Sequence, residues 1–74
     1  MIVYNLKESD GTIIGVYDEL RLAEARVWEL TIETVNEMRL DPENSGYATA
    51  HLPRLIESIR NGFIIERMEV ISRG

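Results

Sequence analysis

Two short runs of β-branched and aromatic residues open the chain and predict two strands. Residues 2–6 (Ile-Val-Tyr-Asn-Leu) form the first run and residues 12–17 (Thr-Ile-Ile-Gly-Val-Tyr) form the second. Asp10-Gly11 between them predicts a hairpin with a type I′ turn, in which both central residues have positive φ. With this turn, the expected cross-strand pairs are Tyr4–Tyr17, Asn5–Val16 and Leu6–Gly15.

The predicted hairpin is apolar on both faces. One face would hold Ile2, Tyr4, Leu6, Ile13 and Tyr17. The other would hold Val3, Ile14 and Val16. This is more apolar surface than a sheet with one solvated face needs. Gly15, inside the second strand, predicts a bulge or the close approach of another element.

A long stretch without Gly or Pro, from Glu19 to Leu40, predicts one helix over 19–40. Asp18 can cap its start. Pro42 ends it, because proline disfavours helical geometry at the preceding residue, Asp41. The cluster Asp-Pro-Glu-Asn-Ser-Gly at 41–46 predicts a turn.

A second, shorter helix is predicted to begin at Thr49 or Leu52 and to end at Asn61-Gly62, with Pro53 in its first turn. Its amphipathic stripe is Leu52, Leu55, Ile56 and Ile59. Residues 63–71 predict a third strand, followed by a short tail at 72–74.

The order β-β-α-α-β indicates an α+β fold, with a three-stranded sheet, one long helix and one short helix. The whole chain, 1–74, is expected to be a single domain, since 74 residues leave room for one. The helices are expected on one face of the sheet. The strand order stays open, because the last strand fits beside the first or beside the second.

The long helix has an apolar arc of about 220° at 100° per residue, whereas a helix packed on a small sheet needs a stripe a little over 100° wide. The arc contains Leu20, Ala23, Ala25, Val27, Trp28, Leu30, Thr31, Ile32, Thr34, Val35 and Met38. One interpretation is that the second helix covers the excess. The other is a homodimer whose interface holds Trp28, Ile32 and Val35, since two-fold dimers are the commonest oligomers.

Composition narrows the function classes. Thirteen acidic residues against eight basic ones give a net charge of −5, which argues against direct binding of nucleic acid. The absence of cysteine excludes disulfides and thiolate metal sites and fits the cytoplasm. Apolar runs are too short to span a membrane, and no basic region precedes an apolar stretch at the start, so we expect no membrane segment and no signal peptide. A domain this small is only marginally stable alone, so burial against a second copy or a partner would matter.

Part of this charge is concentrated on the long helix. Glu29, Glu33 and Glu37 recur at every fourth residue, and Asp41 continues the spacing. Arg26 can pair with Glu29 and Arg39 with Glu43, but Glu33 and Glu37 have no basic residue three or four positions away.

Two interpretations of these carboxylates are open. One is a solvated helix face. The other is a partner-binding surface formed by Glu29, Glu33, Glu37, Asp41, Glu43 and Tyr47, in which a line of carboxylates takes the place of nucleic-acid phosphates. Tyr47 would be an exposed aromatic anchor in the loop between the helices, or else a lid over the core.

No motif in the chain indicates catalysis. His51 is the only histidine, and no nucleophile, base and orienting group stand out near it. The five glycines are scattered rather than gathered in a phosphate-binding loop, and no Asp-rich calcium pattern occurs. We therefore predict no catalytic, cofactor-binding or metal-binding residue.

Gly11-Thr-Ile-Ile-Gly-Val-Tyr17, followed by Leu22-Ala-Glu-Ala25, resembles a group of small phage and Gram-positive bacterial proteins with a DG-x-I-I-G-V-Y hairpin and a following helix. The last strand, 63–70, also resembles theirs, so the resemblance covers about 35 residues in structural rather than catalytic motifs. It implies a hairpin–helix fold and leaves the function open. In size and acidity the chain also resembles early phage proteins that disable a host factor. Some of these proteins bind the sliding clamp, and others are DNA mimics that occupy nucleoid proteins.

These observations predict a non-enzymatic protein-binding module, dimeric and without a cofactor, acting in the host cytoplasm as a phage inhibitor. Its acidic helix face would occupy a basic, DNA-handling surface of a host replication or nucleoid protein such as the sliding clamp. The alternative is a small structural or regulatory dimerisation domain whose acidic face is only solvated.

Overall fold

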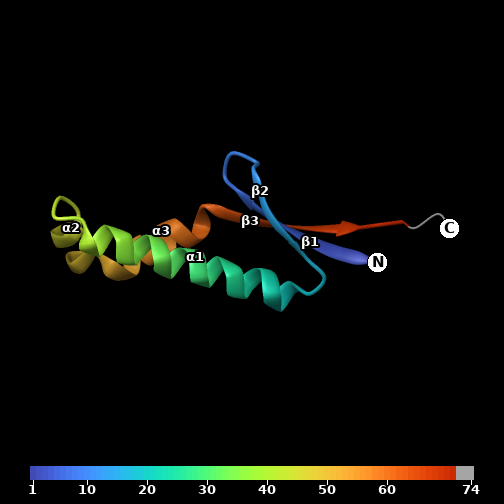
Figure 1. Cartoon of the computed structure of the whole chain (residues 1–74), viewed down its shortest axis with the longest axis horizontal. Coiled ribbons are helices and arrows are strands. Elements are labelled where there is room, and N and C mark those ends of the chain that lie inside the picture. The colour runs from blue at the N-terminus through green and yellow to red at the C-terminus, as the bar shows by residue number, and fades with distance from the viewer. Residues whose placement is uncertain (72–74) are drawn as a thin grey trace.

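The sheet is built around β1, which pairs with a strand on either side. The computed structural model describes residues 1–71, and its strands are β1 (Ile2–Glu8), β2 (Ile13–Tyr17) and β3 (Phe63–Glu69). They form an antiparallel sheet in the order β2-β1-β3 (Figure 1). The last strand therefore lies beside the first, and it ends two residues earlier than predicted. The predicted tail, 72–74, lies outside the described residues.

Three helices follow the hairpin, one more than the sequence predicts. They are α1 (Leu20–Leu40), α2 (Ser45–Ala50) and α3 (Leu52–Asn61). The extra helix, α2, overlaps the end of the turn predicted at 41–46 and the Thr49 start considered for the second helix. It forms because Ala48 is fully buried against the other helices, and this burial offsets the poor helix propensity of the segment. The fold class is α+β, with the order β-β-α-α-α-β.

The helix ends agree only in part with the sequence. Glu19, not Asp18, is the N-cap residue of α1, and no side chain caps the helix there, so the predicted cap is wrong. At the other end, Asp41 has an extended backbone (φ −79°, ψ 119°) before Pro42, as expected for a residue that precedes proline. Gly62 is the C-cap of α3, as predicted.

The turn between β1 and β2 differs from the predicted one. Gly11 has a φ of +92°, and no non-glycine residue of the described chain has a positive φ, so Asp10-Gly11 is not the centre of a type I′ turn. The Gly11 N–H donates to the Glu8 carbonyl oxygen at 2.9 Å, and the Glu8 N–H donates to the Thr12 carbonyl oxygen at 2.9 Å. These bonds close a three-residue loop in which only the last residue needs the left-handed conformation.

A bulge in β2 compensates for the longer loop. Leu6 pairs with Gly15, but Lys7 pairs with Ile13, which leaves Ile14 as an extra residue on β2. The loop moves the register by one residue and the bulge moves it back. The three predicted pairs therefore form, and the predicted bulge is confirmed.

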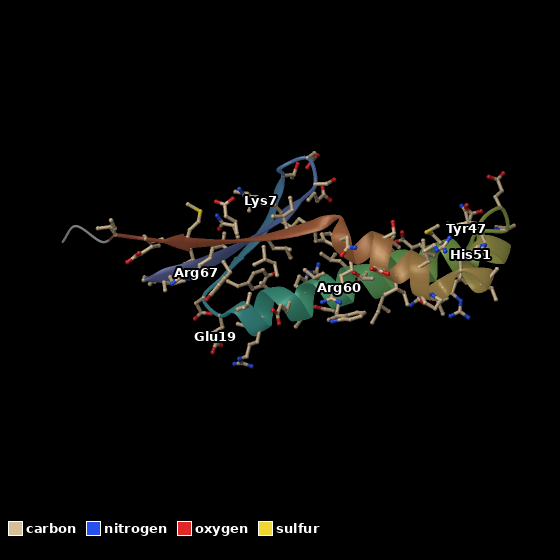
Figure 2. The ribbon with its side chains drawn as sticks, turned by 180° about the vertical axis from the view of Figure 1, so that it is seen from behind. Lys7, Glu19, Tyr47, His51, Arg60 and Arg67 are labelled. Atoms are coloured by element: carbon tan, nitrogen blue, oxygen red, sulfur yellow. The ribbon has the colours of Figure 1, made fainter. Side chains whose placement is uncertain are left out.

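The bulge changes which residues share a face of the sheet. Directly paired residues point to the same side, so Ile13 lies on the face of Lys7 and not on the face of Leu6. The prediction for Ile13 is therefore wrong. Leu6 is fully buried, whereas Ile13 is 56% exposed. Figure 2 shows Lys7 on the side of the sheet that α1 does not cover.

The long helix α1 packs against different elements at its two ends, so the molecule is long and thin. Its first half lies along the sheet and its second half lies beside α2 and α3 (Figure 1). The principal extents are 56 × 21 × 16 Å. The radius of gyration is 15.3 Å, whereas a compact domain of this length has roughly 11 Å. The buried apolar residues are Leu6, Ala23 and Val27 at the sheet end, and Val35, Ala48 and Leu55 at the helical end.

Truncation of Leu6 tests the core at the sheet end. Leu6→Ala should lower the free energy of unfolding by about 2–5 kcal/mol, a large share of the stability of a small domain. The same change at Leu40, which is 84% exposed, should alter it by less than about 0.5 kcal/mol. Urea unfolding followed by circular dichroism at one low protein concentration measures both, and equal effects would contradict this core assignment.

The hairpin loop should carry a pH-dependent contribution to stability. The Thr12 N–H donates to Asp10 Oδ1 at 2.9 Å, and this hydrogen bond lowers the pKa of the Asp10 carboxyl. The contribution is thus present above the unfolded pKa and is lost as the pH falls through the lowered, folded pKa. Asp10→Ala should destabilise the chain at neutral pH, and its difference from wild type should vanish in acid. A difference that stays constant between neutral pH and acid would exclude this contribution.

Candidate functional site

Helix α1 buries one narrow stripe, half-buries a row formed by Arg26, Leu30, Thr34 and Met38, and leaves its remaining surface to solvent. Its buried residues recur at every fourth position: Ala23, Val27, Thr31 and Val35. The Thr31 hydroxyl donates to the Val27 carbonyl oxygen at 2.7 Å, so this buried polar group is satisfied. The predicted arc of about 220° is therefore buried only in part. The exposed remainder of α1 is the candidate site.

Trp28 and Ile32, which we call the apolar strip, lie beside the buried stripe. Trp28 is 44% exposed and Ile32 is 55% exposed. The shorter helices cover α1 at Val35, which is buried with Ala48 and Leu55, and leave the apolar strip partly exposed, with Arg60 of α3 near the Trp28 ring. The sequence places Val35 with Trp28 and Ile32 in one interface. Because Val35 is used inside the chain's own core, the candidate site retains only the other two.

Glu29, Glu33 and Glu37, which we call the acidic row, follow the apolar strip around the helix. All three are exposed. Arg26 Nη1 lies 3.6 Å from Glu29 Oε2, so this predicted ion pair forms. Within residues 1–71, Glu33 and Glu37 make no ion pair, and the pair predicted between Arg39 and Glu43 is not formed. Two of the three carboxylates in the row are therefore uncompensated.

The predicted extension of the row beyond α1 has a different environment. The Asp41 carboxylate accepts hydrogen bonds from the Glu43 N–H at 3.0 Å and from the Asn44 side chain at 2.8 Å. It stabilises the turn after α1 and is half-buried, so it does not continue the row as a free charge. Tyr47 is 53% exposed, and its ring centroid lies 4.9 Å from that of His51. Both rings lie at the α2 end of the molecule (Figure 2).

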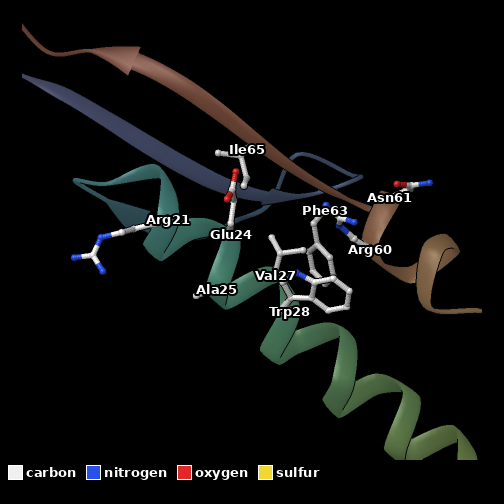
Figure 3. A pocket seen from close by; sticks show the side chains of 9 residues that line it. All are labelled: Arg21, Glu24, Ala25, Val27, Trp28, Arg60, Asn61, Phe63 and Ile65. Carbon is white, nitrogen blue, oxygen red and sulfur yellow. The ribbon is translucent and has the colours of Figure 1, made fainter. Parts of the chain in front are cut away.

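An open groove of about 720 Å³ lies between the first half of α1 and β3 (Figure 3). Its lining includes Val27 and Trp28 from α1 and Phe63 and Ile65 from β3. Arg60, at the end of α3, places its guanidinium carbon 5.2 Å from the centroid of the Trp28 ring, which is cation–π distance. Arg21 and Glu24 line it as well, so the groove beside the apolar strip is apolar with charged residues of both signs.

The sequence did not predict this groove. Arg60, Phe63 and Ile65 are more than 30 positions from Trp28 along the chain, and only the turn at Gly62 brings them beside α1. Phe63 and Ile65 point toward α1 in Figure 3. The alternation of β3 indicates that these two residues share a face, but no local pattern indicates which helix meets that face.

The surface offers apolar contact and negative charge. Thr34, which is half-buried, donates its hydroxyl to the Leu30 carbonyl oxygen at 2.8 Å, so it is engaged by the helix backbone. Over residues 1–71, no group of three or more His, Cys, Asp or Glu side chains is placed to hold a metal ion. No helix in the described part of the chain has the length and hydropathy needed to cross a bilayer.

Removing one charge from the acidic row should stabilise the fold. Glu33 has a like charge four residues away on each side, so Glu33→Gln should raise the free energy of unfolding by about 0.4–1 kcal/mol at low salt. Glu57→Gln is the matched control, because Glu57 has Arg54 and Arg60 three residues away and its loss should be slightly destabilising. Urea unfolding at low and high salt measures both, and a destabilising Glu33→Gln would contradict the uncompensated row.

Comparisons with known proteins leave this site to be interpreted from its own geometry. No protein-family model, no curated protein and no solved structure matched the chain. The resemblance of the hairpin and the last strand to small phage and Gram-positive proteins therefore stays a prediction.

Proposed function

We propose that the chain is a non-enzymatic protein-binding module that docks the exposed surface of α1 on a basic partner. One observation carries the proposal: the fold leaves Trp28 and Ile32 partly exposed, and the acidic row follows them around the same helix, beginning at Glu29, one turn from Ile32. Apolar side chains supply affinity when they are buried in an interface, and tryptophan is among the residues that contribute most. The carboxylates would add orientation and faster association.

The geometry of α1 supports docking as one rigid element. The helix is about 30 Å long at 1.5 Å per residue, and packing at both ends holds it in place. An amphipathic helix binds a partner by laying its apolar residues in a groove. Here the partner's groove would need basic residues along one edge to meet Glu29, Glu33 and Glu37.

A basic surface that handles DNA is the finer proposal for the partner. Neighbouring carboxylates of the acidic row rise about 6 Å along the helix, and they would occupy positions that phosphates occupy on such a surface. The net charge of −5 and the uncompensated Glu33 and Glu37 support it. A replication or nucleoid protein of a host cell, such as the sliding clamp, would be the target of a phage inhibitor of this type.

A small structural or regulatory dimerisation domain is the second candidate. The observation that favours it is the amount of apolar surface that the fold leaves uncovered away from α1, on the sheet. In this candidate, the acidic row is a solvated helix face.

Charge reversal tests the proposed recognition. Immobilised wild-type chain should retain a basic protein from a Gram-positive lysate, and Glu33→Lys combined with Glu37→Lys should abolish its retention at low and moderate salt. Trp28→Ala should weaken it at least tenfold, since truncation of a tryptophan that anchors an interface costs about 2 kcal/mol or more and about 1.4 kcal/mol is tenfold. Glu8→Lys combined with Glu69→Lys is the matched control, with the same change of charge on exposed residues outside α1.

The retained protein is then identified and its DNA binding is measured with increasing amounts of the chain. Displacement of DNA by wild type, and not by the Glu33/Glu37 double variant, is the expected result for DNA mimicry. Retention that survives the double variant, or that the Glu8/Glu69 control abolishes equally, would exclude the acidic row as the binding surface.

A further inference from the structure

The sheet has one covered face and one uncovered face. Leu6 points to the covered face, toward α1, and is fully buried. The register places Lys7 with Ile13 and Ile64 on the opposite face. Lys7 and Arg67 lie on opposite sides of the sheet in Figure 2. We call the uncovered side the open sheet face; its residues are Val3, Asn5, Lys7, Ile13, Val16, Ile64, Glu66 and Met68.

The open sheet face is largely apolar and exposed. Val16 is 58% exposed, Ile13 56%, Ile64 48% and Met68 41%. These side chains come from the two outer strands, β2 and β3, and β1 contributes the half-buried Val3 with Asn5 and Lys7 between them. Exposed apolar residues gathered on one side of a small protein mark an interaction surface.

The charges on this face neutralise each other. Lys7 Nζ lies 2.7 Å from Glu66 Oε2, and the two side chains are 23% and 47% exposed. Asn5 is 8% exposed, and its side-chain amide contacts Met68 Sδ at 2.7 Å. The face therefore presents no net charge to attract a strongly basic or acidic partner. A surface that is apolar and neutral fits best against another of the same kind.

The surface area of the whole molecule indicates a second copy. The accessible surface is 5614 Å², whereas a compact monomer of this mass exposes roughly 4,700 Å². The excess of roughly 900 Å² is close to the roughly 800 Å² that each partner buries in a standard interface. The open sheet face is three strands wide, with seven residues in β1 and β3 and five in β2, and it measures at most about 14 × 24 Å. It accounts for roughly a third of this excess, and the apolar strip of α1 adds to it.

We propose that the open sheet face is a homodimer interface, in which two copies pack sheet against sheet about a two-fold axis. Such an interface is self-complementary, because each apolar residue meets an apolar residue of the other copy. The two sheets would lie about 10 Å apart, as in other face-to-face sheet pairs. The two Lys7–Glu66 pairs would then meet as alternating charges near the centre. Both α1 helices would stay on the outside, so two acidic rows would be presented on opposite sides.

This interface rests on the second proposed function, a dimerisation domain, and assigns the dimer contact to the open sheet face. It does not depend on the basic partner proposed for α1. Two sheet faces of this size bury on the order of 700–1,000 Å² in total, which is typical of a weak, reversible interface. We therefore expect a dimer with a dissociation constant in the micromolar range. The dimer should form in the pure protein without any other component.

Sedimentation velocity of the pure chain from 10 to 500 μM tests the interface. Wild type should shift from monomer to dimer over this range. Val16→Lys and Ile64→Lys, which place a charge in the open sheet face, should each raise the dissociation constant at least tenfold. Ile32→Lys is the matched control on α1, with a comparable exposure of 55%, and it should leave the dimer intact while it weakens retention of the basic partner.

A second measurement needs no substitution. Amide NMR shifts of wild type should change with concentration along β1, β2 and β3 and not along the exposed side of α1. Wild type that stays monomeric at 500 μM would overturn the proposal. The proposal would also be overturned if Ile32→Lys made the chain monomeric and Val16→Lys left it dimeric, since that result would place the interface on α1. Circular dichroism of each variant confirms that it is folded.

Discussion

The fold depends on one helix that joins two small cores. Helix α1 buries Ala23 and Val27 beside the sheet and Val35 beside α2 and α3, all on one stripe. Neither core is large, because few side chains in the described chain are fully buried. Stability in a chain this short depends on each buried group, since the domain buries only about 60% of its unfolded surface. The helix must therefore stay continuous from the sheet to α3 for either core to persist.

This arrangement decides where the chain can interact. A helix packed at both ends along a narrow stripe leaves its other side open, which exposes Trp28, Ile32 and the acidic row. A sheet covered by a single helix leaves its second face open, which exposes Val16 and Ile64. The two surfaces differ in character: one combines apolar residues with uncompensated carboxylates, and the other is apolar with its charges paired. The proposed basic partner on α1 and the proposed second copy on the sheet would therefore use separate surfaces.

The hairpin shows how a sequence pattern can predict pairing and yet misplace a side chain. A two-residue turn at Asp10-Gly11 predicts that Leu6 pairs with Gly15, and it does. The loop instead has three residues, and the extra residue Ile14 restores the register. Between the loop and the bulge the alternation is inverted, so Ile13 faces the open side rather than the core. The apolar character of both faces, which exceeds what a half-solvated sheet needs, is already visible in the sequence.

Local chemistry determined the elements of this protein, and contacts between distant segments decided its surfaces. Neighbouring residues determine the strands at both ends, the long helix, its end before Pro42 and the spacing of the acidic row. They do so because backbone sterics and periodicity act over a few positions. Three features do not follow from neighbouring residues. They are the place of β3 beside β1, the formation of α2, and the burial of Val35 while Trp28 is exposed. Each depends on which apolar faces meet in space: Ala48 stabilises α2 only because Val35 and Leu55 surround it. The groove beside Trp28 likewise exists only because the chain turns at Gly62 and returns along the sheet.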